Sequence, residues 1–241
     1  MDLKTKIFEI EAADEQYQAL EKLARFVPKD KGGFLVIGLA LVSYQLSWTG
    51  ELWRKDVAFF AQQIKEEITK EQFLKARAFV LKKSKYNRRL QNMKLKRLQY
   101  FLKAKDEFLK NIDSFKDLGK FNKWLSDFMD QPSDAKTIVF ATKIRWRWLR
   151  VWGEEKIFPF DVKIPLDSRW IKFFHKIGIE DKKYMQQYIK EISTKLNIPP
   201  LHIDWILWPI IGSNTVESLQ DIPLLLARYL GISSNHQSPD F

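Results

Sequence analysis

The chain has 241 residues, of which 45% are hydrophobic and 14% aromatic, and a formal net charge of +11 at pH 7. This composition supports a packed core and excludes an intrinsically disordered chain, while the absence of cysteine excludes disulfides and thiolate-bound metals. The excess of positive charge favours a polyanionic partner, with nucleic acid as the first candidate. Lysines that only keep the protein soluble are the alternative.

No feature of a metal enzyme, a secreted protein or a membrane protein stands out. The three histidines, His175, His202 and His236, lack the spacing of a helical HExxH site. The N-terminal segment is too acidic and too interrupted for a signal peptide. The longest apolar run, residues 32–46, is too short to span a membrane. We therefore expect a cytoplasmic protein that works without a metal, a dissociable cofactor or a membrane.

Helical periodicity of apolar residues dominates the chain, and no stretch alternates as a half-buried strand does. Thr69 and Gln72 match a capping box, and Pro200 suits a helix start. The prediction is an all-α protein with one long irregular connection, about 152–166, a length that is often functional. In chain order, the expected helices are 14–27, 33–46, 51–67, 70–82, 85–111, 114–129, 134–150, 168–177, 182–196, 200–211 and 216–230.

Residues 82–105 hold ten lysines or arginines and no acidic residue. As part of one helix over 85–111, they would form a cationic stripe opposite an apolar face. Backbone phosphates would bind such a stripe without reading the base sequence, although a merely solvated helix face explains the pattern equally well. The stripe would consist of Lys85, Arg88, Arg89, Asn92, Lys96 and Lys103, and the apolar face of Leu90, Met93, Leu98 and Phe101.

Two polar residues lie in strongly apolar stretches, where an unmatched polar group costs about 1–3 kcal/mol. Gln45 ends the most apolar expected helix, so its amide either bonds neighbouring backbone or is held for the hydrogen-bonding edge of a ligand. Asp204 lies in a second apolar helix, with Trp208 four residues later on the same face. Its carboxylate either pairs with His202 or an arginine, or accepts a ring N–H of a ligand that stacks on the indole.

Lys136 has an unusual position for a cation. The preceding residues suit a helix start with Ser133 as N-cap, so Lys136 falls in the first turn, where the helix dipole disfavours positive charge. Near a core, this position should populate the free amine, a nucleophile that forms Schiff bases. Phe140 and Lys143 follow on the same face. Lys143 is an alternative nucleophile, and a lysine that merely tolerates its position is the alternative to both.

Asp167 follows the irregular connection 152–166 and precedes the helix expected over 168–177. It is therefore expected to cap the N-terminus of that helix with its side chain. A capping carboxylate at the mouth of a loop is still able to serve a second purpose, because it is charged and faces outward.

Five stretches, in order over about residues 36–212, together resemble the archaeal 8-oxoguanine DNA glycosylases, a branch of the helix-hairpin-helix DNA glycosylase/lyases. They are LALVSYQLSWTGELW, SKYNRRLQNMKLKRL, SDAKTIVFATK, IPLDSRW and IPPLHIDWILWPIIG. The resemblance implies an all-helical fold in which two subdomains, about 36–130 and 1–35 with 131–241, flank a base pocket. One departure is the stretch QPSDAK, which stands where the superfamily usually has Gly-x-Gly before the lysine helix.

By this resemblance, Lys136 would be the nucleophile that attacks C1′, and Asp167 would assist its deprotonation and stabilise developing positive charge. The implied activity is a DNA repair N-glycosylase/AP lyase that excises 8-oxoguanine from double- or single-stranded DNA and cleaves the strand by β-elimination. We expect it to act as a monomer. The base-binding residues would be Gln45, Phe140, Asp204 and Trp208, and the expected backbone-binding residues are Lys85, Arg88, Arg89, Lys96 and Lys143.

Two other interpretations stay open at this point. A non-catalytic, basic helical protein that binds DNA or RNA explains the charge and the aromatic content, but not an acid and an amide within apolar segments. A peripheral membrane protein that uses the helix expected over 85–111 fits less well, because the tryptophans are spread through core helices. Among these, Trp146, Trp148 and Trp152 either belong to the core or form a DNA wedge.

Overall fold

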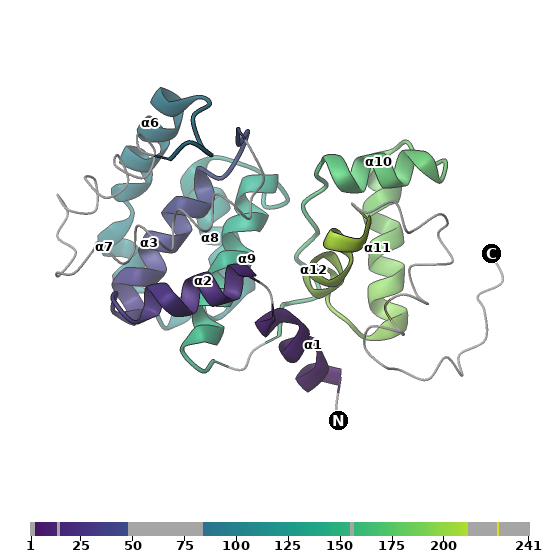
Figure 1. Ribbon diagram of the computed structural model, residues 1–241, viewed down its shortest axis with the longest axis horizontal. Helices are drawn as coiled ribbons and strands as arrows, with labels where there is room; N and C mark the ends of the chain where they lie inside the picture. Colours follow the sequence, from purple (N-terminus) through teal and green to yellow (C-terminus); the bar gives the residue numbers. More distant parts are fainter. Residues whose placement is uncertain (1–2, 14, 48–83, 155–156, 212–225, 227–241) are drawn as a thin grey trace. The chain divides into compact units, whose positions relative to one another are not determined.

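The computed structural model describes residues 3–13, 15–47, 84–154, 157–211 and 226, and within these ranges every regular element is a helix (Figure 1). The all-α prediction is confirmed. None of the described helices is long and apolar enough to cross a membrane. In chain order, the elements are α1 (Leu3–Ala12), α2 (Glu15–Ala24), α3 (Lys29–Leu41), α6 (Gln91–Leu102), α7 (Lys105–Lys110), the 3-10 helix η1 (Ser114–Lys116), α8 (Leu118–Met129), α9 (Lys136–Val151), α10 (Ser168–Lys176), α11 (Lys182–Leu196) and α12 (Pro200–Ile211).

Most helix boundaries follow the local sequence signals. α11 and α12 begin and end at the predicted residues, and α10 ends one residue early. The single helix expected over 85–111 is wrong, because α6 and α7 are separate and a loop precedes α6. α1 was not predicted. The helices expected over 51–67 and 70–82, with their capping box, and nearly all of 216–230 lie outside the described residues.

The chain divides into two compact units. Unit 1 comprises residues 1–12 and 157–241, and unit 2 comprises residues 13–156. Lys136 therefore belongs to unit 2 and Asp167 to unit 1. The bounds of these two units differ from those of the two subdomains expected from the sequence, 36–130 and 1–35 with 131–241. The expected subdomains stay a prediction.

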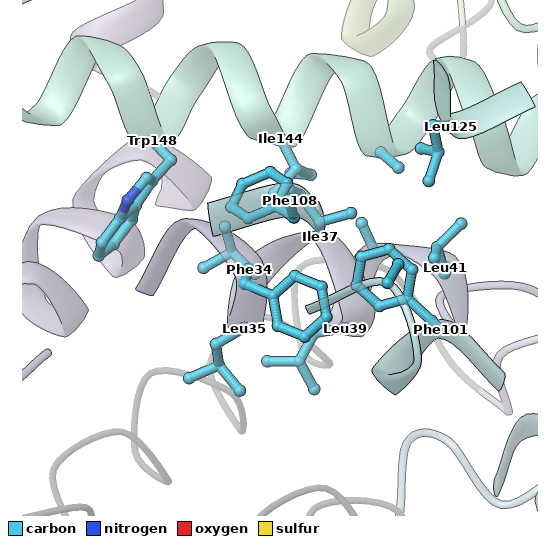
Figure 2. Close-up of a cluster of buried hydrophobic side chains, with 14 of the residues drawn as sticks. Phe34, Leu35, Ile37, Leu39, Leu41, Phe101, Phe108, Leu125, Ile144 and Trp148 are labelled. Carbon is cyan, nitrogen blue, oxygen red and sulfur yellow. The ribbon is translucent and has the colours of Figure 1, made fainter. Parts of the chain in front are cut away.

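The core of unit 2 forms where α3 packs against α9 (Figure 2). α3 is buried on all sides, since every residue from Gly32 to Leu41 is buried, which explains its nearly unbroken run of apolar side chains. Phe34 stacks on Phe101 of α6, with 4.5 Å between ring centroids. Ile144 of α9 and Leu125 of α8 complete this side of the core.

Trp148 of α9 occupies space that a glycine of α3 leaves. A Cβ atom at Gly32 would overlap the indole ring, so this glycine permits the close approach of the two helices. The indole Nε1 donates a 2.6 Å hydrogen bond to the carbonyl of Lys29. Trp146 and Trp148 are 1% and 0% exposed and belong to the core, whereas Trp152 is 38% exposed.

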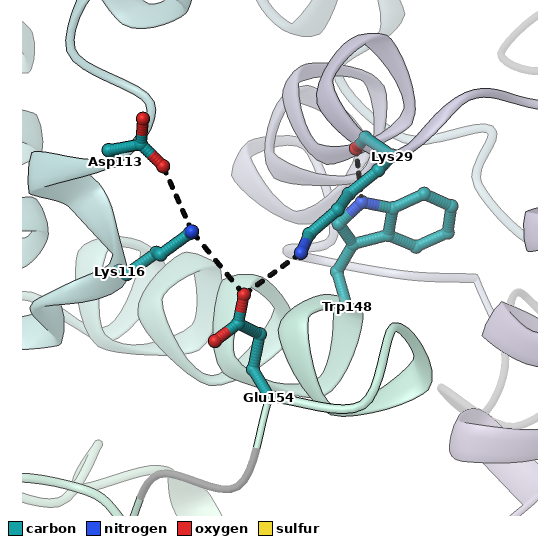
Figure 3. Close-up of polar contacts among 5 residues, drawn as sticks. All are labelled: Lys29, Asp113, Lys116, Trp148 and Glu154. Carbon is teal, nitrogen blue, oxygen red and sulfur yellow. Dashed lines mark hydrogen bonds and ion pairs between the residues drawn. The ribbon is translucent and has the colours of Figure 1, made fainter.

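An ion-pair network joins the end of α9 to the start of α3 and to η1 (Figure 3). The carboxylate of Glu154 lies 2.9 Å from the Lys29 Nζ and 3.5 Å from the Lys116 Nζ. Lys116 also pairs with Asp113 at 2.9 Å. The hydrogen bond from Lys29, together with the charges of Lys29 and Lys116, lowers the pKa of Glu154 although partial burial opposes the shift.

The core of unit 1 lies between α10, α11 and α12. Trp170 stacks on Phe174, with 5.6 Å between ring centroids, and Phe174 meets Tyr188 of α11 edge-on at 6.0 Å. Trp170 and Phe174 are fully buried. The Phe174–Tyr188 contact packs α10 against α11.

The α3–α9 contact generates a stability prediction. Gly32→Ala should lower the free energy of unfolding by about 1–3 kcal/mol, because the added methyl group overlaps the buried Trp148 ring. Urea unfolding would measure the change. Gly119→Ala in α8 is the matched control, since its Cβ would approach only the Asp117 carboxylate, at 3.4 Å, and it should be neutral or stabilising. Equal losses in both variants would contradict the packing explanation.

The Glu154 network generates a pH prediction. Because the pKa of Glu154 is lowered in the folded state, its contribution is present above the unfolded glutamate pKa of about 4.3 and is lost as the pH falls below it. Glu154→Gln should therefore reduce the free energy of unfolding at pH 7 by roughly 0.5–1 kcal/mol. The difference in unfolding free energy between wild type and variant should disappear once the pH lies below the folded-state pKa of Glu154. Urea unfolding across this range, with the exposed Glu21→Gln as control, would test it. A difference that is independent of pH would contradict the charge-based explanation.

Candidate active site

The loop between α8 and α9 is fixed by side chains of unit 2. Ser126 donates a 2.6 Å hydrogen bond to the carbonyl of Gln131, whose N–H returns a 3.1 Å bond to the carbonyl of Ser126. The amide of Asn122 donates to the carbonyl of Ser133 at 3.2 Å and to Thr142 at 3.0 Å. Polar side chains, rather than a glycine-rich sequence, therefore hold this hairpin.

A second set of bonds ties the hairpin to the first turn of α9. The guanidinium of Arg97 in α6 donates to the amide oxygen of Gln131 at 2.7 Å and to the hydroxyl of Thr137 at 3.0 Å. Thr137 also donates to Gln131 at 3.0 Å. The residue next to Thr137 is Lys136, so the backbone that carries this lysine is held from both sides.

Lys136 is the first residue of α9, and its side chain is exposed. Ala135 occupies the N-cap position without a side-chain hydrogen bond, so the prediction of Ser133 as N-cap is wrong. The expected burial near the core is also wrong. What remains is an accessible amine at the positive end of a helix dipole. Further along α9, Phe140 is half-buried against the core of unit 2 and Lys143 is only 9% exposed.

Gln45 does not lie in a helix. α3 ends at Leu41, and Gln45 is exposed with a backbone φ of 44°. The expectation of an amide buried in the most apolar helix is therefore wrong. A non-glycine residue in the left-handed region is uncommon and costs free energy unless the surroundings impose it. Here the hydrophobic run of the sequence continues past the helix end, which is why periodicity misplaced the residue.

The segment that carries Gln45 is paired with the loop before α6. The N–H of Ser47 donates to the carbonyl of Tyr86 at 2.9 Å, and the N–H of Arg88 donates to the Ser47 hydroxyl at 3.3 Å. The buried amide of Asn87 donates to the carbonyl of Val42 at 3.2 Å. These three bonds explain how the strained backbone at Gln45 is held in place.

A buried lysine supports this pairing. Lys94 of α6 is 0% exposed; its amine donates to the side-chain oxygen of Asn87 and lies 4.9 Å from the centre of the Tyr44 ring. Burial, together with the charge of Arg89, lowers the pKa of Lys94 to about 8. The sequence analysis missed this residue, although its spacing of four and seven residues from the buried Leu98 and Phe101 places it on the inner face of α6.

The cationic stripe is exposed but does not lie on one helix. Lys85, Arg88 and Arg89 precede α6, whereas Lys96 lies within it, and all four side chains are exposed. The predicted apolar face is correct for Leu98 and Phe101, which are buried, and wrong for Leu90 and Met93, which are 39% and 59% exposed. Leu90 adopts a left-handed conformation, φ 55°, at the N-cap of α6, so it does not share a helical face with Leu98 and Phe101.

In unit 1, Asp167 caps α10 as predicted. Its Oδ1 accepts hydrogen bonds from the backbone N–H of Arg169 at 2.9 Å and of Trp170 at 3.2 Å. Its Oδ2 accepts a third bond, 2.7 Å long, from the indole Nε1 of Trp208 in α12. The carboxylate is thus fixed by three donors, and one of them is a residue that the resemblance assigns to base binding.

Asp204 and Trp208 project from α12 toward the first turn of α10. Asp204 is 0% exposed, and its Oδ1 accepts a 2.6 Å hydrogen bond from the Trp170 indole, a partner that the sequence did not indicate. The guanidinium carbon of Arg169 lies 3.6 Å from the centre of the Trp208 ring, and its NH1 donates to the Trp208 carbonyl at 3.4 Å. His202 accepts a 3.2 Å bond from the N–H of Phe158.

Metal ligands are not grouped in the part of the chain that the structure describes. No three or more His, Asp or Glu side chains there lie together in a way that could hold a metal ion. The expectation of an activity without a metal or cofactor stays a prediction. In unit 2 the described site residues offer an exposed amine and exposed cations, and in unit 1 they offer two fixed carboxylates and an aromatic ring.

Comparison with known proteins gives a consistent result. A family model described as AGOG, N-glycosylase/DNA lyase, matches residues 2–237. A protein of Methanopyrus kandleri named N-glycosylase/DNA lyase is 35% identical over 225 residues, which cover 91% of this chain and 87% of that protein. One of Methanococcus maripaludis with the same name is 34% identical over 212 residues, 85% of this chain and 81% of that protein.

A solved structure shares the fold. The crystal structure of an 8-oxoguanine DNA glycosylase from Pyrobaculum aerophilum, complexed with 8-oxoguanosine, superposes with a TM-score of 0.68. The match covers 91% of this chain and 89% of that protein, at 23% sequence identity. The resemblance drawn from the five sequence stretches is therefore confirmed at the level of family and fold.

The buried lysine generates a pH prediction. Because the pKa of Lys94 is lowered on folding, the unfolded chain binds more protons between about pH 8 and 10, and stability should rise with pH there. Lys94→Met lacks this titrating group. The free energy of unfolding of the wild type, relative to that of Lys94→Met, should therefore rise by at most about 1.4 kcal/mol per pH unit. Urea unfolding between pH 7 and 10 measures it. The exposed Lys96→Met should show no such divergence; parallel curves for Lys94→Met would contradict the shift.

Proposed function

The chain belongs to the N-glycosylase/DNA lyase family, and on this premise we propose that it repairs DNA by excising 8-oxoguanine and cleaving the strand at the same site. The relative of the same fold from Pyrobaculum aerophilum is an 8-oxoguanine DNA glycosylase that binds 8-oxoguanosine. The observation that carries the proposal for this chain is the exposed amine of Lys136, the first residue of α9, on a hairpin fixed by Asn122, Ser126 and Arg97.

Lys136 would act as the nucleophile. Its amine nitrogen forms a bond to C1′ while the glycosidic bond breaks, and the base leaves with the bonding electrons and takes up a proton. Opening of the sugar ring gives an imine, which acidifies the neighbouring C2′ position. Loss of that proton then expels the 3′ phosphate by β-elimination. An uncharged lysine amine is a nucleophile for carbon electrophiles and forms Schiff bases, and the exposure of Lys136 leaves its amine accessible.

Asp167 would assist this chemistry as a fixed anion. Its carboxylate accepts three hydrogen bonds, so it needs no reorganisation when positive charge develops on the sugar, and preorganised charge of this kind is an effective source of catalysis. The cap bonds use Oδ1 and the Trp208 bond uses Oδ2, and this fixed arrangement supports a second role alongside helix capping.

Recognition of the base requires that the nucleotide leave the stack, at a cost of a few kcal/mol that contacts in the pocket offset. We propose Phe140 and Trp208 as the stacking residues and Gln45 and Asp204 as hydrogen-bonding partners. The strained, exposed backbone of Gln45 supports a role in binding, because such strain is concentrated at functional sites. The fixed position of Asp204 on the Trp170 indole supports a role as a directional acceptor.

Contacts to the DNA backbone would come from the exposed cations near α6, which are Lys85, Arg88, Arg89 and Lys96. Binding through such residues depends strongly on salt and little on sequence. Lys143 was proposed for the same purpose, and as the alternative nucleophile, but only 9% of its surface is exposed. Its burial favours Lys136 as the nucleophile. Monomeric state and cytoplasmic location stay predictions.

Borohydride trapping tests the nucleophile. Wild-type protein should become covalently linked to DNA that contains 8-oxoguanine, because reduction fixes the imine. Lys136→Gln should abolish trapping and slow excision by at least about a thousandfold, while affinity for the same DNA changes little. Lys143→Gln, on the same helix, is the matched control and should retain trapping.

Three results would overturn this assignment. Trapping that persists in Lys136→Gln would place the nucleophile elsewhere, and trapping lost only in Lys143→Gln would identify the alternative lysine. A parallel loss of DNA affinity and activity in Lys136→Gln would show that this lysine contacts phosphate rather than C1′.

A further inference from the structure

The first turn of α10 contacts α12 at three points, all within unit 1. Asp167 accepts from the edge of the Trp208 ring, Trp170 donates to Asp204, and Arg169 stacks on the face of Trp208. The first contact joins Asp167 and Trp208, and the second joins Trp170 to Asp204; the proposed function assigns roles to Asp167, Trp208 and Asp204. The third belongs to a residue that the proposed function does not use.

The Arg169 contact is a face-on stack. Its guanidinium carbon lies 3.6 Å from the ring centre, well inside the roughly 6 Å over which cation–π attraction acts. The same guanidinium donates from NH1 to the Trp208 carbonyl at 3.4 Å. Since Trp208 Nε1 is bonded to Asp167 at 2.7 Å, the indole is held at one edge and on one face.

Two consequences follow for the neighbouring groups. Rotation of the indole would break the bond to Asp167, so whatever fixes the ring also fixes the Oδ2 atom of that carboxylate. A purine that stacks on Trp208 has only the face opposite Arg169 available. A ring that is already immobile binds a stacked ligand at a lower entropic cost than a mobile one.

We propose that Arg169 is a positioning residue of the glycosylase site, which backs the indole of Trp208 so that the ring presents its opposite face to the base and keeps its N–H on Asp167. This inference rests on the proposed function, because that function assigns Trp208 to the base and Asp167 to the chemistry. Arg169 itself touches neither the base nor the reacting sugar.

The geometry allows a clean set of variants. Arg169→Met removes the guanidinium but keeps the backbone N–H that caps onto Asp167 at 2.9 Å, so the start of α10 is preserved. Lys172→Met removes the same charge from an exposed position on the same helix and serves as control. Arg169→Lys keeps the charge but loses the planar group that stacks. It separates a stack on the indole, which lysine restores poorly, from a phosphate contact, which lysine restores well.

Single-turnover excision of 8-oxoguanine from a duplex, at saturating enzyme, gives the functional measurement. Arg169→Met should slow excision about tenfold, as expected for the loss of one cation–π contact, and Arg169→Lys should remain closer to Arg169→Met than to wild type. Lys172→Met should leave the rate unchanged. Affinity for an undamaged duplex should be the same in Arg169→Met and Lys172→Met. Full rescue by Arg169→Lys would overturn the proposal in favour of a phosphate contact.

The Trp208 indole N–H resonance in nitrogen–proton NMR spectra, assigned by its loss in Trp208→Phe, gives a measurement that does not depend on activity. Arg169→Met should shift this resonance and speed its exchange with solvent, whereas Lys172→Met should do neither. An unchanged resonance would overturn the proposal. The two experiments also separate this proposal from the proposed function. If Arg169→Met shifts the Trp208 resonance but the wild-type protein does not excise 8-oxoguanine, the positioning of Trp208 is supported and the proposed substrate is rejected. Tighter binding of damaged DNA by Arg169→Met would overturn the proposal, because Arg169 would then occupy the place of the base.

Discussion

The carboxylate of Asp167 is the constraint on which the arrangement of unit 1 depends. One oxygen holds two backbone N–H groups that start α10, and the other holds the indole of Trp208 on α12. The Asp167 carboxylate therefore both caps α10 and orients the Trp208 side chain. Because the next two residues, Arg169 and Trp170, contact Trp208 and Asp204, a single helical turn fixes the polar and aromatic groups that α12 presents.

Unit 2 achieves a comparable rigidity by different means. The hairpin before α9 lacks the glycines that would let its backbone amides approach a phosphate closely, and it is held instead by Asn122, Ser126 and the Arg97–Gln131 pair. Polar side chains of α6, of α8 and of the loop itself thus fix the start of α9 and hence the position of the Lys136 backbone. The stretch QPSDAK contains no glycine, and the loop is held by side chains that lie outside it as well as by its own Gln131.

What the sequence could predict depended on whether the signal was local. The bounds of α11 and α12 and the N-cap at Asp167 follow from capping residues and periodicity, which act within a few positions. The expected position of Gln45 within a helix is wrong, because apolar residues continue beyond the end of α3 and periodicity therefore does not indicate where the helix ends. The Lys94–Asn87 pair and the Arg169–Trp208 stack join side chains that are 7 and 39 residues apart, and no local rule connects them.

The lysines of this protein show why a perturbed pKa alone does not identify a nucleophile. Burial lowers the pKa of Lys94 to about 8, so the pKa alone would favour Lys94 as the nucleophile. Its side chain, however, is 0% exposed and contacts Asn87 and Tyr44. A nucleophile must reach a carbon atom of its substrate, and burial that lowers the pKa also removes access. A helix N-terminus opposes positive charge without enclosing the amine. Lys136 is exposed at the first residue of α9, which is why we propose it, rather than the buried Lys94, as the nucleophile.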